Sequence, residues 1–189
     1  QGKKWQDDLG ISMRVSVNVS ARQLITESLV NQIKEGLDET GFPAYLLDIE
    51  ITETSALNSI ETMINCLTAI RAMGATVSMD DFGTGYSSLS MLTKMPLDFL
   101  KIDRSFMEGI PGNIGNEELI STIVVMAHNL NLRVVAEGVE TIEQLQFLQD
   151  LACEYIQGYY FSKPVNANTI VKLTRQGVAP SNQLGTEII

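Results

Sequence analysis

The sequence predicts an α/β fold in which a parallel sheet is covered by helices. Six short runs rich in β-branched and other apolar residues alternate with stretches of helical periodicity, and parallel strands need such crossover connections. The runs are typical of strands that are covered on both faces. An open doubly wound sheet and an eight-stranded βα barrel both agree with this pattern, although six strands are two fewer than a closed barrel requires.

Three strands are expected in the first half of the chain, each followed by a helix. The strands cover residues 12–18, 46–52 and 75–79. Ser20 and Gln23 form a capping box ahead of the first helix, and Gly41 ends it. Apolar residues with helical spacing mark the second helix: Ile60, Met63, Ile64, Leu67 and Ile70. A short third helix, residues 87–95, stops before Pro96.

The second half repeats the pattern, with strands expected at 99–102, 133–136 and 155–161. A loop at 111–116 precedes a long helix marked by apolar residues from Leu119 to Ala127. Thr141 and Gln144 form a second capping box. A last helix is expected at 166–176.

Length and composition are those of one globular domain. The 189 residues are 44% hydrophobic and 19% charged, and a chain of this length buries roughly 70% of its unfolded surface, so it needs no disulfides. No run of 18 apolar residues is present, so we expect no membrane contact. Cys66 and Cys153 form no C-x-x-C pair and are expected as core thiols. Together with the lack of a signal peptide, this favours a cytoplasmic location.

The charge and the histidine content exclude several classes of function. The net charge of −10 disfavours polymeric DNA or RNA as a partner. His128 is the only histidine, which disfavours zinc sites and Ser-His-Asp catalysis because both depend on histidine side chains. We expect His128 to be structural.

Polar residues stand at the carboxyl end of every predicted strand. In chain order they are Asn18, Glu50, Asp80 with Asp81, Lys101, Glu137 and Gln157. Functional groups of parallel α/β proteins gather at that end of the sheet. Oxygen ligands without imidazole or thiolate favour Mg²⁺ or Mn²⁺ over zinc. The adjacent Asp80 and Asp81 suit two bridged ions, an arrangement used in phosphoester cleavage.

Less specific explanations exist for each residue alone. A single polar residue at a strand end is also explained by the strand's emergence into solvent. The Asp80–Asp81 pair is also explained as a turn or a helix cap, and Lys101 as a solvated surface lysine. Six such ends in succession favour a shared site. The loop at 82–88 contains G-x-G without a third glycine, so its glycines favour a tight, mobile loop over dinucleotide binding.

Six sequence blocks resemble those of the EAL-domain family, bacterial phosphodiesterases that hydrolyse cyclic di-GMP. The blocks are VNVSARQL at 17–24, DIEITE at 48–53, MDDFGTGYSSLSML at 79–92, DFLKIDRSF at 98–106, VVAEGVET at 134–141 and QGYYFSKP at 157–164. The resemblance covers 12–176, which leaves 1–11 as a lead-in and 177–189 as a tail or linker. It implies a TIM-like (β/α) barrel with one strand running against the others.

The resemblance also implies an activity and a role for each site residue. The activity is hydrolysis of cyclic di-GMP to linear pGpG with two Mg²⁺ or Mn²⁺ ions. Asn18, Glu50 and Asp80 resemble ligands of the first metal, and Asp80, with Asp81 beside it, bridges to the second. Lys101 resembles the residue that orients the attacking water. Glu137 resembles a carboxylate near the second metal, Gln157 a polar group that completes the site, and Glu140 the anchor of the loop at 82–88.

One departure from the family pattern is that the chain contains no Glu-Ala-Leu. In the family this motif lies on an early barrel strand and supplies a further ligand of the first metal. We therefore expect an N-terminally truncated barrel with about six of its eight strands, impaired hydrolysis, and unpaired edges at strands one and six that favour a homodimer.

Three functions remain open at this point. Intact DDFGTG, KID and AEGVE blocks favour a metal-dependent phosphodiesterase. The missing motif favours a non-catalytic module that binds cyclic di-GMP or a protein. An unrelated Mg²⁺-dependent barrel of the enolase type lacks support from the order of the blocks. The resemblance further implies a sensor or GGDEF cyclase domain elsewhere in a longer protein.

Overall fold

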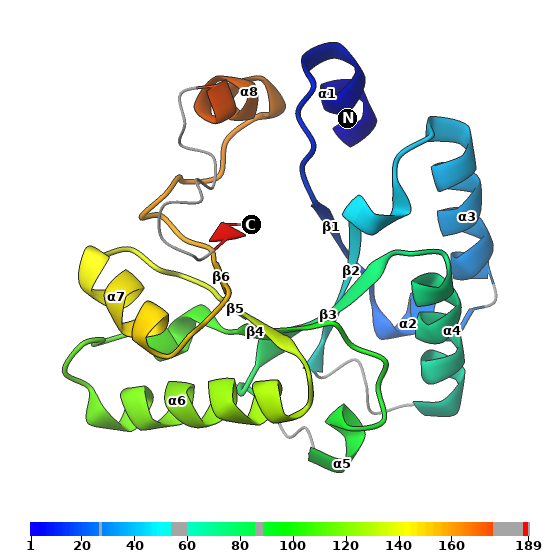
Figure 1. Ribbon diagram of the computed structural model, residues 1–189. Helices are drawn as coiled ribbons and strands as arrows, with labels where there is room; N and C mark the ends of the chain where they lie inside the picture. The colour runs from blue at the N-terminus through cyan, green and yellow to red at the C-terminus, as the bar shows by residue number, and fades with distance from the viewer. Residues whose placement is uncertain (27, 54–59, 86–88, 176–186, 189) are drawn as a thin grey trace. The chain divides into compact units, whose positions relative to one another are not determined.

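The computed structural model describes residues 1–26, 28–53, 60–85, 89–175 and 187–188. It divides into two compact units, Gln1–Phe99 and Leu100–Ile189, and the division falls within strand β4 (Phe99–Ile102). Each unit contains parallel strands joined by helices (Figure 1). None of the helices in the described residues is long and apolar enough to cross a membrane.

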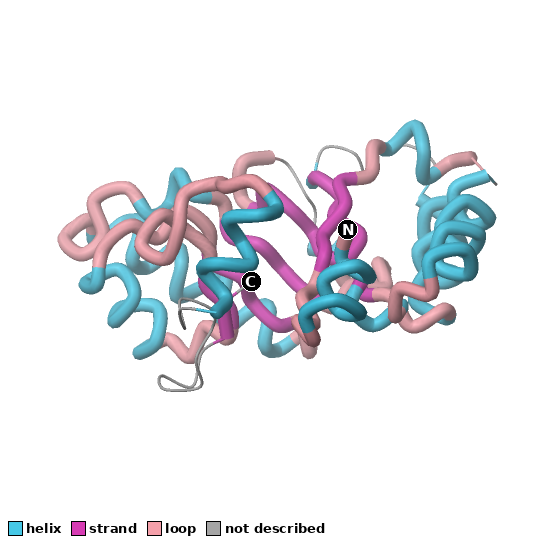
Figure 2. The backbone as a smooth tube through the Cα atoms, turned by 90° about the horizontal axis from the view of Figure 1, so that it is seen from above, coloured by secondary structure: helices cyan, strands magenta, loops and turns pink. Residues whose placement is uncertain are grey.

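The first unit is built on three parallel strands. Its elements are α1 (Gly2–Leu9), β1 (Val15–Asn18), α2 (Ala21–Leu24), α3 (Ser28–Thr40), η1 (Ala44–Leu46), β2 (Leu47–Thr52), α4 (Ile60–Ala72), β3 (Thr76–Phe82) and α5 (Leu89–Leu92). β1 pairs with β2, and β2 pairs with β3. Helices α3 and α4 lie side by side, as Figures 1 and 2 show, and α4 packs against β3.

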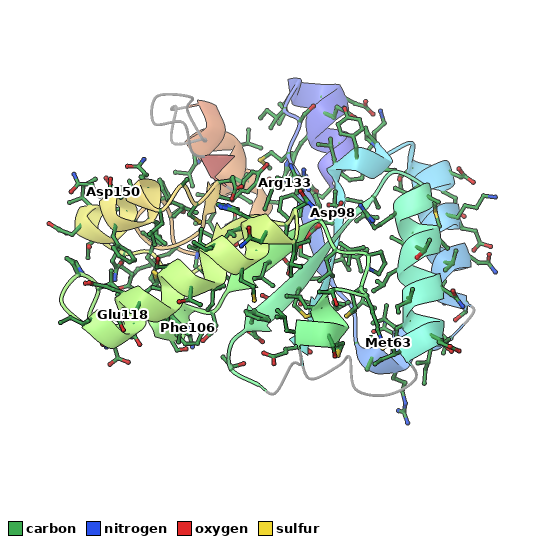
Figure 3. All side chains as sticks on the ribbon, turned by 60° about the horizontal axis from the view of Figure 1, so that its bottom comes forward. Met63, Asp98, Phe106, Glu118, Arg133 and Asp150 are labelled. Atoms are coloured by element: carbon green, nitrogen blue, oxygen red, sulfur yellow. The ribbon has the colours of Figure 1, made fainter. Side chains whose placement is uncertain are left out.

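The two faces of β2 and β3 are both buried, but they differ in chemistry. Successive side chains of a strand point to opposite faces. One face is apolar and contains the fully buried Ile49, Ile51, Val77 and Met79. The buried residues of α4, among them Met63 (Figure 3), belong to the same core. The other face carries Asp48, Glu50 and Ser78, which are buried as well. The prediction that strands are covered on both faces is confirmed for β2 and β3. One of their two buried faces carries polar side chains.

Asp98, just before β4, ties the start of that strand to β3 (Figure 3). Its backbone N–H donates to the carbonyl of Val77 at 2.8 Å, and its Oδ2 accepts from the Val77 N–H at 3.0 Å. Arg71 of α4 adds a bidentate ion pair, with N···O distances of 2.8 and 3.0 Å. Strand, helix and connection are therefore fixed together at this point of the first unit.

In its described residues, the second unit contains the remaining strands, one long helix and two helices of nine residues each. Its elements after β4 are η3 (Arg104–Met107), α6 (Ile114–Asn129), β5 (Arg133–Ala136), α7 (Ile142–Asp150), β6 (Tyr155–Ile156), α8 (Ala167–Arg175) and β7 (Glu187–Ile188). β5 pairs with β6 and β6 with β7, both in parallel. Helix α6 packs on β5, and its buried residues are Ile120, Ile123, Val124 and Ala127.

Two predicted boundaries are wrong for local reasons. The strand expected at 155–161 ends at Ile156, because the chain then turns: the Tyr160 N–H donates to the carbonyl of Val139 at 2.9 Å and the Phe161 N–H to that of Gly158 at 3.1 Å. The loop expected at 111–116 gives way to helix α6 from Ile114. The Asn113 side chain caps this helix by accepting from the Asn116 N–H at 3.3 Å.

Other differences concern the ends of the chain and the sheet edges. Helix α1 was not expected from the polar lead-in, and the first predicted helix is divided into α2 and α3. The tail contributes β7, so the expectation of an unpaired edge at strand six is wrong. β1 has β2 as its only strand neighbour in the described part of the chain, and Val17 on it is 43% exposed. Residues 176–186 of the predicted helix and tail lie outside the described residues, as do 87–88 of the short helix.

Candidate functional site

The strand ends of the first unit place three predicted ligands on one face. The register sets Asn18 opposite Glu50 and Thr52 opposite Asp80. Glu50 and Thr52 are two residues apart on β2, so their side chains leave the sheet on the same side. Paired strands lie about 4.8 Å apart, so Asn18 lies beside Glu50, and Asp80 lies beside Thr52 on the other side of β2. Glu50 is buried, with an exposed fraction of 8%, whereas Asn18 is exposed and Asp80 is half-buried.

The Asp80–Asp81 step is conformationally unusual. Asp81 has a φ of 55°, in the left-handed region that residues other than glycine rarely adopt. Its N–H donates to the carboxylate of Asp80 at 3.1 Å, and its carbonyl accepts from the Thr84 hydroxyl at 2.8 Å. Strain of this kind is typical of functional sites, where the surroundings hold it in place.

Glu53 holds the loop that follows Asp81, a contact that the sequence analysis missed. This carboxylate is 4% exposed, and its Oε2 accepts the N–H groups of Gly83 and Gly85, each at 3.1 Å. A Cβ at position 85 would lie 2.9 Å from Glu53 Oε1, so only glycine allows this approach without a shift. The signal was present in the block DIEITE, which ends on Glu53 three residues after Glu50.

The buried Lys101 and the half-buried Glu137 form an ion pair in the second unit. Lys101 Nζ lies 2.7 Å from Glu137 Oε1, and Lys101 is 5% exposed. The Glu137 N–H donates to the carbonyl of Ile102 at 3.1 Å, which sets the end of β5 beside the end of β4. Two sequence-predicted residues that lie 36 positions apart are thus brought into direct contact.

Gln157 is placed by the backbone that surrounds it. Its N–H donates to the carbonyl of Ala136 at 2.8 Å, and its carbonyl accepts from the Val139 N–H at 3.2 Å. A Cβ at the next residue, Gly158, would lie 2.1 Å from the Val139 carbonyl oxygen. The glycine therefore permits the close approach that brings the exposed Gln157 beside the end of β5.

Two further acidic residues of the second unit have structural contacts. The Glu140 N–H donates to Gln144 Oε1 at 2.8 Å, within the capping region of α7. Its expected role as the loop anchor stays a prediction. Asp103 caps η3 by accepting from the Ser105 N–H at 3.0 Å. Partial burial opposes ionisation of Asp103, but hydrogen bonds from Ser105 and Arg104 outweigh it and lower the pKa of the carboxyl.

The remaining candidates from the sequence have ordinary surroundings. Cys66 and Cys153 are free and buried. Burial raises the pKa of the Cys66 thiol and, more strongly, that of Cys153 to about 12. His128 Nε2 lies 3.2 Å from Glu154 Oε1, and Glu154 Oε2 accepts the N–H of Val134 at 2.9 Å. These contacts join α6 to β5 and agree with a structural role for His128.

The donor set of the first unit fits a hard divalent cation. Carboxylate and amide oxygens are the ligands that Mg²⁺, Mn²⁺ and Ca²⁺ prefer, and Asn18, Glu50 and Asp80 supply them from three neighbouring strands. Within the described ranges, no cluster of three or more His, Cys, Asp and Glu side chains is close enough to hold a metal ion.

Comparison with known proteins identifies the chain. The model of the EAL domain family matches residues 1–164. The chain belongs to the EAL domain family. It is 46% identical over 153 residues to the cyclic di-GMP phosphodiesterase NbdA of Pseudomonas aeruginosa, a match covering 81% of this chain and 20% of that protein. It is 36% identical over 171 residues to the bifunctional diguanylate cyclase/cyclic di-GMP phosphodiesterase MucR of the same species, covering 90% and 25%.

Solved structures of EAL proteins confirm the predicted fold class. The EAL domain of Mycobacterium smegmatis DcpA superposes with a TM-score of 0.87 at 36% identity, covering 93% of this chain and 79% of that one. Klebsiella pneumoniae BlrP1, solved with cyclic di-GMP and either calcium or manganese, gives a TM-score of 0.76 at 30% identity. That match covers 86% of this chain and 41 to 42% of BlrP1. The chain spans about a fifth to a quarter of the length of the curated relatives NbdA and MucR.

Proposed function

We propose that this EAL domain hydrolyses one phosphodiester bond of cyclic di-GMP, giving linear pGpG with the aid of two divalent ions, Mg²⁺ or Mn²⁺. The observation that carries the proposal is the placement of Asn18, Glu50 and Asp80 on one face of three registered strands. The family relationship supports the substrate, since NbdA is named for this activity and BlrP1 was solved with this dinucleotide.

In this proposal the predicted metal ligands and the predicted water-positioning group have separate roles. Asn18, Glu50, Asp80 and Asp81 would hold divalent ions, which when bound would neutralise phosphate charge and lower the pKa of water. Lys101 orients this water, and Glu137 restrains the ammonium through their 2.7 Å contact. Water adds to phosphorus, the P–O3′ bond breaks, and the proton ends on the 3′ oxygen. Gln157 contributes a further polar group, and Glu140 supports the loop.

The test is conversion of cyclic di-GMP to pGpG, followed by chromatography, with Mn²⁺ present. The wild-type chain is expected to turn over substrate at an impaired rate, because it contains no Glu-Ala-Leu, and Asp80→Asn is expected to lose the remaining activity by a factor of a hundred or more because a proposed carboxylate ligand is removed. Asp38→Asn is the control, since it removes an exposed carboxylate of the same unit from α3. Equal activity of Asp80→Asn and wild type would overturn the proposal.

A second candidate is a non-catalytic module that binds cyclic di-GMP, which the absence of Glu-Ala-Leu from the 189 residues favours. Binding of the dinucleotide by the wild-type chain without any formation of pGpG would select this function. A cyclase or sensor domain in a longer protein is a further proposal, supported by the name of the relative MucR.

A further inference from the structure

A polar network lies below the candidate ligands of the first unit, on the same face of the strands. Asp48, 3% exposed, is at its centre. Its Oδ1 accepts from the Thr76 hydroxyl at 2.6 Å, and its Oδ2 accepts from the hydroxyls of Ser78 at 2.6 Å and Ser16 at 3.3 Å. The three donors come from β1 and β3, the neighbours of β2 on either side.

The network satisfies a group that is otherwise costly to bury. A carboxylate taken out of water is tolerated only when it is well hydrogen-bonded, and bonds to an ionised acceptor are stronger than neutral ones. Arg14 extends the network, because its guanidinium donates to Thr76 Oγ1 at 2.8 Å and lies 4.8 Å from the centre of the Phe99 ring. The three strands are thus joined by side chains in addition to the backbone ladder.

The position of the network relates it to the candidate metal ligands. Ser16, Asp48 and Thr76 form one registered row, and Asn18, Glu50 and Ser78 form the next row towards the carboxyl ends. Ser78 belongs to both parts, since it bonds Asp48 and stands opposite Glu50. Asp80 follows two residues later on β3. The network therefore fixes the register of the three strands next to the row that carries the candidate ligands.

We infer that Asp48 is a positioning residue, which holds β1, β2 and β3 at the spacing that Asn18, Glu50 and Asp80 need to bind a divalent cation. The inference rests on the proposed function. It assigns no ligand role to Asp48, whose two oxygens are occupied by hydroxyl donors. Loss of the network is expected to loosen the geometry of the ligands while their chemistry stays unchanged.

The experiment is a calorimetric titration of the chain with Mn²⁺ alone, at a temperature where circular dichroism shows each variant folded. Asp48→Ala is expected to weaken Mn²⁺ binding about tenfold, at the lower end of the losses caused by groups that orient metal ligands. Thr76→Val removes one hydroxyl while keeping the shape of the side chain, and a smaller loss of affinity is expected. Thr76→Ser keeps the hydroxyl and is expected to bind like wild type.

Val77→Ala is the matched control. Val77 is fully buried beside Thr76, but on the apolar face of β3, so its truncation lowers the melting temperature and leaves Mn²⁺ affinity unchanged. If Asp48→Ala and Thr76→Val lower the melting temperature yet bind Mn²⁺ like wild type, the network is structural only and the inference is wrong. If Asp48→Ala does not fold, the difference in Mn²⁺ affinity between Thr76→Val and Thr76→Ser tests the inference instead. A wild-type chain that binds no Mn²⁺ would overturn the proposed function together with this inference.

Discussion

The two units stabilise buried or half-buried carboxylates in different ways. In the first unit, hydroxyl groups hold Asp48 and the backbone amides of Gly83 and Gly85 hold Glu53. In the second unit, Glu137 is held by the ammonium of Lys101. Neutral donors stabilise a carboxylate without cancelling its charge, whereas an ion pair neutralises it. The difference lies in the partner group, which is a neutral hydrogen-bond donor in the first unit and a cationic side chain in the second.

The largest effect on folding is expected from breaking the ion pair of the second unit. Lys101→Met leaves Glu137 without this cation, and removal of one member of a buried pair costs about 3 kcal/mol of unfolding free energy. Chemical denaturation measures it. The double variant Lys101→Met/Glu137→Gln is expected to recover most of the loss, because residue 137 then carries no charge that needs the ammonium. A double variant as unstable as Lys101→Met would contradict this description of the pair.

Removing the charge of Glu53 tests the neutral-donor arrangement. Glu53→Gln replaces one acceptor oxygen with a donor facing the loop amides, with an expected cost of about 2 kcal/mol for hydrogen bonds to a charged group. Hydrogen exchange at Gly83 and Gly85 is expected to accelerate, since both amides lose their charged acceptor. Glu39→Gln on the exposed face of α3 is the control and should leave both amides unchanged. Unaltered exchange in Glu53→Gln would show that other contacts hold the loop.

The capping boxes compare equivalent motifs in the two units. Thr141 accepts from the Gln144 N–H at 3.3 Å, and the buried Gln144 also donates to the Met107 carbonyl at 3.0 Å, so this box joins α7 to the end of η3. Ser20 is the N-cap residue of the four-residue α2 at an exposed site, where its hydroxyl donates to Gln23 Oε1 at 2.7 Å. Thr141→Ala is expected to cost about 1 kcal/mol and Ser20→Ala less. Thermal unfolding of both variants checks the order, and the reverse order would contradict it.

The smallest effect concerns the two thiols. Burial raises the pKa of Cys153 to about 12, and that of Cys66 is raised as well. An unfolded cysteine ionises near pH 8.5, so the stability gained from the neutral buried thiol is present below that pH and declines as the pH rises towards 12. At pH 8.5 iodoacetamide is expected to modify Cys66 slowly and Cys153 only after denaturation. Mass spectrometry of the native chain would contradict this if Cys153 reacted first.

Sequence reasoning found the candidate ligands because strand ends obey a simple rule. Parallel strands bring their carboxyl ends to one edge, so Asn18, Glu50 and Asp80 could be placed together from the strand pattern alone. The Lys101–Glu137 contact follows from the same rule applied to adjacent strands. The element order was predictable for the same reason, since helical and strand periodicities alternate clearly from residue 12 onwards.

The features that were missed depend on packing rather than on periodicity. Asp48 lies within a mostly apolar run of the sequence. Its burial is explained by the hydroxyl groups of β1 and β3 that donate to it. Glu53 lies beyond a strand end, and its role depends on a loop 30 residues later in the chain. The early end of β6 results from the close approach of Gly158 to Val139, which no local pattern of residues 155–161 reveals.

The most direct test of the account is paramagnetic broadening of backbone amide signals by Mn²⁺ in an NMR titration. At substoichiometric Mn²⁺, the amides of Asn18, Glu50 and Asp80 are predicted to broaden first, and Asp80→Asn is predicted to suppress the effect. Broadening that begins at surface carboxylates such as Asp7 or Asp38, with the strand ends unaffected, would contradict a cation site at the carboxyl ends of β1, β2 and β3.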